Sequence, residues 1–134
     1  MCALAACEGD PRNDANLYLD RVQRIDLDDP LDLRRLRVEA LATLPVASDV
    51  VRSARDACVE AHRAIIDAEE TSAEARAAFE GYASEDAIPQ AERLRIEEDI
   101  RQSNRAVERS RGLFSRCHRL TRDLELRYRR RRSR

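Results

Sequence analysis

The longest hydrophobic pattern in the chain divides into two arms between Ser48 and Tyr128. In the first arm, apolar or small residues recur at alternating steps of three and four, at Val51, Ala54, Cys58, Ala61, Ile65, Ala68, Ser72, Ala75, Phe79 and Tyr82. The second arm repeats the alternation at Ile96, Ile100, Ser103, Val107, Ser110, Phe114, Cys117, Thr121, Leu124 and Tyr128. This heptad pattern is typical of helices that pack along one stripe. It predicts two long helices, at about residues 48–83 and 88–130.

The two arms predict an antiparallel hairpin that bends near Ile88 and Pro89. Residues that face each other should then lie equally far from the bend, and this register pairs Cys58 with Cys117, Val51 with Leu124, Ala61 with Phe114, Ile65 with Ser110, Ala68 with Val107, Ala75 with Ile100 and Phe79 with Ile96. Most of these layers set a small residue against a large one, as close helix packing requires. Ser72 facing Ser103 would be a thin, polar layer. We therefore expect looser packing toward the bend, where a second copy of the chain could also pair.

Two shorter helices are predicted before the hairpin. The first, about residues 14–27, would be capped by Asn13 or Asp14 and would bury Leu17, Tyr18, Val22 and Ile25. The second, about residues 30–44, would start at Asp29-Pro30, end before Pro45, and bury Leu33, Leu36, Ala40, Leu41 and Leu44.

The short helices reach along only half of the hairpin, because each is about half as long as an arm. Their connection to Ser48, the expected N-cap of the first arm, places them at the base of the hairpin. A second stripe on the last arm, at Ala106, Leu113 and Leu120, would receive them.

Composition supports an all-α fold. The 134 residues include only three Gly and four Pro, no Trp and 38% charged residues. We therefore predict a long, coiled-coil-like antiparallel hairpin with two short N-terminal helices packed at its base, forming one domain over residues 13–134 after a signal remnant and tether at residues 1–12. The net charge is −1, but residues 1–99 carry 12 Arg and 23 acids, whereas residues 100–134 carry 13 Arg and 3 acids. The simplest interpretation is that the flanks of the arms attract each other.

No pattern in the sequence indicates catalysis. The adjacent pairs Glu69-Glu70 and Glu97-Glu98 do not have the spacing of a carboxylate and histidine metal site. A glycine-rich phosphate loop and a nucleophile elbow are also missing from the sequence. We expect a protein that is not an enzyme and that uses no cofactor.

The first residues contain the tetrapeptide Leu4-Ala5-Ala6-Cys7. It resembles the lipobox of bacterial lipoproteins, in which small residues precede an invariant cysteine. The resemblance implies that Cys7 becomes the acylated first residue of a mature lipoprotein. Only six residues precede Cys7, fewer than a signal peptide needs. We therefore expect the natural start to lie upstream of Met1; the alternative is an ordinary Ala-rich N-terminus.

The remaining cysteines bear on the redox environment. If Cys2 is removed and Cys7 is acylated, Cys58 and Cys117 are left, and the register brings them face to face. An exported protein would join them in a disulfide. Two alternatives are a pair of reduced core cysteines and a zinc site completed by His62 and His118.

The C-terminus carries a cluster of arginines, Arg127, Arg129, Arg130, Arg131, Arg132 and Arg134. This cluster is a candidate site for polyanions or anionic lipid, although cations at a helix C-terminus are also favourable by themselves.

The sequence as a whole predicts a non-catalytic helical lipoprotein of the bacterial envelope, anchored in a membrane through Cys7 and facing the periplasm. It would act as an adaptor, an assembly factor or a chaperone-like module that binds a protein partner. The alternative is a cytoplasmic hairpin that dimerises and binds nucleic acid or another polyanion through its arginine-rich C-terminus.

Overall fold

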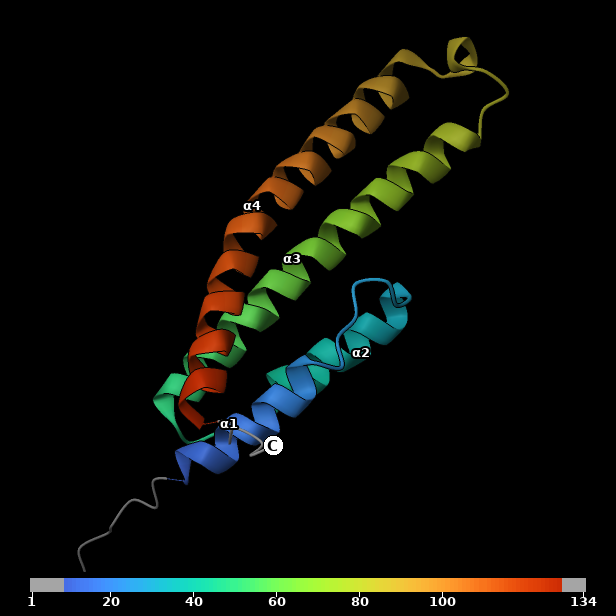
Figure 1. Ribbon diagram of the computed structural model, residues 1–134. Coiled ribbons are helices and arrows are strands. Elements are labelled where there is room, and N and C mark those ends of the chain that lie inside the picture. Colours follow the sequence, from blue (N-terminus) through green and yellow to red (C-terminus); the bar gives the residue numbers. More distant parts are fainter. Residues whose placement is uncertain (1–8, 129–134) are drawn as a thin grey trace, which may run out of the picture.

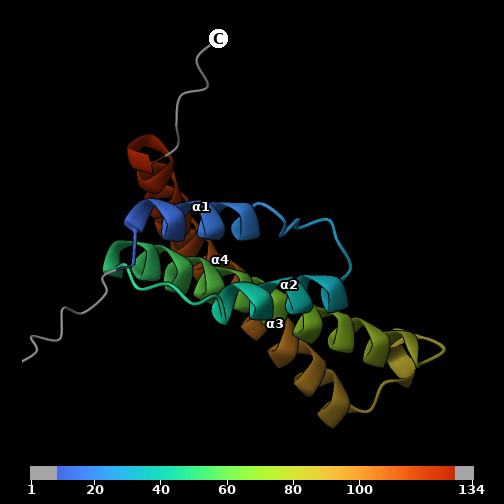
Figure 2. The same cartoon turned by 90° about the horizontal axis from the view of Figure 1, so that it is seen from below.

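The computed structural model describes residues 9–128, and each regular element in that range is helical (Figure 1). The four α-helices are α1 (Pro11–Val22), α2 (Leu31–Ala42), α3 (Asp49–Glu80) and α4 (Gln90–Tyr128), with a short 3-10 turn at Glu85–Ala87 before α4. The long C-terminal helix α4 packs against α3, whereas α1 and α2 lie beside the half of this pair that is remote from the bend (Figures 1 and 2). The predicted all-α class is confirmed.

One side of α4 is buried at every seventh residue, at Ile96, Ser103, Ser110, Cys117 and Leu124. The facing side of α3 buries mainly small residues: Val51, Ala54, Cys58, Ala61, Ala68 and Ala75. Other residues predicted for the same stripes are half exposed, with Phe79 at 47% and Ile100 at 46%. The prediction that these two side chains are buried between the long helices is wrong, because the cluster that is buried near the bend is formed by Ala75, Ile88 and Ile96.

The main core lies at the base, where all four helices contribute. It contains Ala15, Tyr18, Leu19, Ile25, Val38, Leu41, Leu44, Val46, Val51, Ala54, Cys58, Val59, Ala61, Ile66, Cys117 and Leu124. A second, smaller cluster near the bend consists of Ala75, Ile88 and Ile96. Leu113 and Leu120 of the expected receiving stripe pack against the edge of the main core. The hydrophobic contribution to stability is therefore concentrated at the base.

The buried faces of α1 and α2 are rotated from those predicted. In α1, Leu17 is 41% exposed and Leu19 is buried in its place, next to Tyr18. In α2, Leu36 is 68% exposed, whereas Val38 and Arg34 point inward. The physical reason for the error in α2 is that Arg34 forms an ion pair with Glu69 of α3, which allows a charged residue to occupy the inner face.

The helix starts also differ from those predicted. Asp10 caps α1 by accepting a hydrogen bond from the Arg12 amide at 3.0 Å, so α1 starts three residues before the predicted Asp14. Pro30 precedes α2, and the carboxylate of Asp29 pairs with Arg37 instead of capping the helix. Ser48 occupies the N-cap position of α3, but its side chain makes no capping hydrogen bond.

Asp14 joins α1 to the start of α3. Its side chain is buried, and one carboxylate oxygen accepts hydrogen bonds from the backbone amides of Ala47 at 2.8 Å and Ser48 at 2.9 Å. The negative charge also lies close to the positive end of the α3 dipole. Asp14 thus fixes the two residues that lead into α3, but it does not bind the first-turn amides that a capping side chain of Ser48 was expected to bind.

We predict that Asp14→Ala lowers the free energy of unfolding by about 2 kcal/mol, because two amides lose a charged acceptor. Urea denaturation would measure the loss. Asp20→Ala, at an exposed position of α1, is the matched control and should change the stability by less than about 0.5 kcal/mol. Equal losses in the two variants would contradict the assigned role of Asp14.

Candidate functional site

A disulfide joins α3 to α4 between Cys58 and Cys117, with the two Cα atoms 4.6 Å apart. This separation is within the range that a disulfide requires. Ala54 and Ala61, on either side of Cys58, are fully buried and too small to hold the backbones apart. The structure thus confirms the predicted disulfide.

The disulfide rules out the predicted zinc alternative in this structure, because neither sulfur is a free thiolate. The two histidines of that alternative both contact the Phe114 ring, whose centre is 5.0 Å from that of His62 and 5.8 Å from that of His118. Within residues 9–128, no group of three or more His, Cys, Asp or Glu is placed to hold a metal ion.

The disulfide closes a long loop that contains the bend, because its two cysteines are 59 residues apart in the sequence. In the chain-entropy description, closing such a loop stabilises the fold by about 4 kcal/mol. That contribution is large compared with what the many alanines of the core can add, because each alanine buries little apolar area. The disulfide is therefore a main determinant of how α3 and α4 pair.

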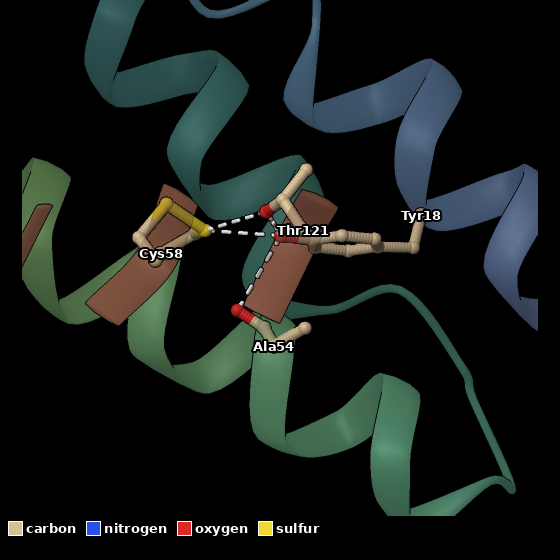
Figure 3. The surroundings of a disulfide bond; sticks show 5 residues. Tyr18, Ala54, Cys58 and Thr121 are labelled. Carbon is tan, nitrogen blue, oxygen red and sulfur yellow. Dashed lines mark hydrogen bonds between the residues drawn. A yellow bond between two sulfur atoms is a disulfide. The ribbon is translucent and has the colours of Figure 1, made fainter. Parts of the chain in front are cut away.

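The hydroxyl of Tyr18 points from α1 to the disulfide (Figure 3). Its oxygen lies 2.9 Å from Sγ of Cys58, 2.7 Å from Oγ1 of Thr121 and 3.4 Å from the carbonyl oxygen of Ala54. A disulfide sulfur carries no hydrogen, so it accepts from the hydroxyl groups. Tyr18 thereby links α1 to both long helices at one point.

Sequence reasoning placed Tyr18 in the core but missed this hydrogen-bonded cluster. A usable signal was available, since a buried tyrosine hydroxyl usually finds a partner. Thr121 follows Cys117 by one helical turn and is therefore on the same side of α4.

The disulfide is shielded from solvent. Cys58 is 0% exposed and Cys117 is 2% exposed, and Tyr18, which lies against Cys58, is also 0% exposed. Burial raises the pKa of Tyr18 to about 12, although the hydrogen bond from Thr121 opposes this rise. The disulfide therefore has the environment of a structural cross-link rather than that of an exposed, exchanging one.

A second polar cluster lies where α2 meets α3. Arg34 is 2% exposed and pairs with Glu69, while its Nε and Nη2 atoms have no hydrogen-bond partner among residues 9–128. His62 is also buried, edge-on to Phe114. Burial, together with the positive charges of Arg34 and then His118, lowers the pKa of His62 to about 4. His62 is therefore neutral at physiological pH.

Two of the surface grooves contain residues of both long helices. The larger, of about 820 Å³, includes Val59, Arg63, Gly112 and Leu113 among its lining residues. The smaller, of about 330 Å³, lies nearer the bend and is lined by Ser72, Ala75, Arg76, Phe79, Ile96 and Ile100. Tyr18 and His62 line neither groove.

Several residues singled out in the sequence lie outside the described part of the chain. These are Cys7 and the arginines Arg129, Arg130, Arg131, Arg132 and Arg134. Arg127 is described, and its guanidinium carbon lies 6.0 Å from the centre of the neighbouring Tyr128 ring. Among residues 9–128, we find no helix with the length and apolar character needed to cross a bilayer.

Comparisons with protein-family models, curated proteins and solved structures found no match to this chain. The functional argument therefore rests on the chain's own residues.

We predict that the stability of the protein falls as the pH is lowered from 6.5 to 4, because unfolded His62 takes up a proton in that range and folded His62 does not. The contribution of this one group is about 2–3 kcal/mol. Denaturation curves of the wild type and His62→Leu at several pH values would isolate it. His62→Leu should lose less stability on acidification than the wild type. In His118→Asn, the free energy of unfolding should fall with pH nearly as steeply as in the wild type. Parallel curves for the wild type and His62→Leu would contradict the assignment.

We predict that Tyr18→Phe lowers stability by about 1 kcal/mol and speeds reduction of the disulfide about fivefold, because α1 then leaves the sulfurs exposed more often. Dithiothreitol treatment with thiol quantification would measure the rate. Tyr82→Phe, at the bend, is the matched control and should leave the rate unchanged. If the disulfide of Tyr18→Phe is reduced at the wild-type rate, the Tyr18 hydroxyl does not control access of the reductant to the disulfide.

Proposed function

We propose that this chain is a non-catalytic, helical binding module of the bacterial cell envelope, anchored through acylated Cys7 and facing the periplasm. Its role would be that of an adaptor, an assembly factor or a chaperone-like protein. The observation that carries the proposal is the buried disulfide between α3 and α4. Such disulfides persist in oxidising compartments and are rare in the cytosol of mesophiles.

The position of Cys7 suits such an anchor. Only Glu8, Gly9 and Asp10 separate it from the start of α1. The N-terminal end of α1 lies at the base, opposite the bend (Figure 1). An acyl chain on Cys7 would hold the base near the membrane, and the 32 residues of α3 would carry the bend about 48 Å away from it.

We further propose that α3 and α4 act as a coiled-coil-like antiparallel hairpin that presents its far end to a partner. The seven-residue spacing of the buried side chains on α4 supports this proposal. The helical pair would then serve as a rigid arm, cross-linked near the membrane by the disulfide between Cys58 and Cys117.

A binding role, rather than a catalytic one, is supported by where the titratable groups with the largest pKa shifts lie. Tyr18 and His62 are buried at the contacts that α1 and α2 make with the long helices. Their shifts follow from packing, whereas catalytic groups with shifted pKa values need access to a substrate.

The second candidate is a cytoplasmic dimer that binds a polyanion through Arg127 and the arginines that follow it. The half-exposed side chains of Phe79 and Ile100 favour it, because they leave a surface that a second copy could cover. The two candidates differ in the chemical state of Cys7.

We predict that the protein, expressed from its own gene in a bacterial host, is found in the membrane fraction and carries a diacylglyceryl group on Cys7. Mass spectrometry of its N-terminal peptide would detect this modification. Cys7→Ser is the control, and it should lose both the modification and the membrane association. Unmodified Cys7 in a wild-type protein recovered from the cytosol would reject the envelope proposal and favour the dimer.

A further inference from the structure

The layer formed by α1 and α2 stops partway along the long helices. The N-terminal end of α2 is attached to α3 by the ion pairs of Arg34 with Glu69 and of Arg35 with Glu70. The smaller groove begins immediately beyond them, at Ser72. We call its lining residues Ser72, Ala75, Arg76, Phe79, Ile96 and Ile100 the distal face.

The distal face continues the surface that α1 and α2 cover at the base. On α3, Arg76 follows Glu69 by two helical turns and so lies on the same side. On α4, Ile100 precedes Phe114 by four turns, and Phe114 contacts His62 and packs against the main core. A single side of the helical pair is therefore covered at one end and open at the other (Figure 1).

The open part of this surface exposes large apolar side chains. Phe79 and Ile100 are 47% and 46% exposed. Seven-residue steps from Phe79 toward the base reach the buried Cys58 and Val51, whereas those from Ile100 reach the half-buried Val107 and Phe114. Ile96, between them, is already buried. A helix laid along this groove would remove the exposed parts of Phe79 and Ile100 from water, as α2 does for apolar residues at the base.

The groove lining contains one charged residue, Arg76. The charge of the surrounding bend region indicates what kind of helix would fit. Seven carboxylates near the bend form no ion pair within residues 9–128: Glu74, Glu80, Glu85, Asp86, Glu92, Glu97 and Asp99. Three arginines in the same region likewise form no ion pair with described residues: Arg76, Arg93 and Arg95. The region thus has an excess of negative charge. Next to the distal face, Glu69 and Glu70 of α3 pair with arginines of α2, and this is the same complementarity.

We propose that the distal face binds an amphipathic helix of net positive charge, supplied by a partner protein, which extends the layer of α1 and α2 toward the bend. The inference rests on the proposed binding function and names its site and the chemistry of its partner. Apolar residues of the bound helix at spacings of three and four would contact Phe79 and Ile100. Its lysines or arginines would face the unpaired carboxylates and speed association.

The test uses two synthetic helical peptides with the same leucine positions. One carries lysine and arginine at its polar positions, and the other carries glutamate. Fluorescence anisotropy with the disulfide-bonded protein should show the basic peptide binding at least tenfold more tightly than the acidic one, and more weakly as salt is raised.

Variants locate the site. Phe79→Ser and Ile100→Ser should each weaken binding of the basic peptide about tenfold, because each removes an apolar contact. Leu36→Ser removes a more exposed leucine from α2 and should leave binding unchanged. The double variant Glu80→Lys and Glu97→Lys should reduce the ratio between the affinities for the basic and the acidic peptide. Circular dichroism on each variant would establish that it retains its helices.

Three results would overturn the proposal. The first is no binding of the basic peptide, and the second is equal weakening by Leu36→Ser and Phe79→Ser. The third is a dimer in sedimentation velocity that Phe79→Ser converts to a monomer, since a second copy would then occupy the distal face. If the same protein is acylated at Cys7 and fails these tests, the distal-face inference fails while the envelope proposal stands.

Discussion

The structure depends on the close approach of α3 and α4 at the covalent bond between Cys58 and Cys117. That approach, 4.6 Å between the two Cα atoms, is possible because Ala54 and Ala61 flank the bond on α3. The alanines that permit it bury little apolar area. The cross-link thus adds its stabilisation inside the main core at the base, at a layer where the neighbouring residues of α3 are small.

The short helices are held to this pair by the shared apolar core and by several polar groups with defined partners. Tyr18 contacts the disulfide layer, Asp14 binds the start of α3, and Arg34 pairs with Glu69. Burying polar groups of this kind costs free energy unless they form hydrogen bonds or ion pairs. They therefore favour the one position of α1 and α2 on the long helices in which these partners meet. The ion pairs of Arg34 and Arg35 with Glu69 and Glu70 form close to the residue where α2 begins, Leu31.

The sequence predicted the helical class and the pairing of the two cysteines, because heptad spacing and equal distance from the bend are properties of the chain alone. It did not predict that Arg34 is buried or that Leu36 is exposed. Arginine is usually a surface residue, so a search for apolar positions at helical spacing assigns it to the outer face. The role of Asp14 depends on a contact with Ala47 and Ser48, distant in sequence. The exposure of Phe79 depends on which residues form the buried cluster near the bend, and these are Ala75, Ile88 and Ile96.

The most direct test of this account is a peptide map, under non-reducing conditions, of the protein isolated from its native cells with free thiols alkylated at lysis. The account predicts one cross-linked peptide pair containing Cys58 and Cys117, with neither cysteine alkylated. Full alkylation of both cysteines, or a cross-link of either to a different cysteine, would contradict it.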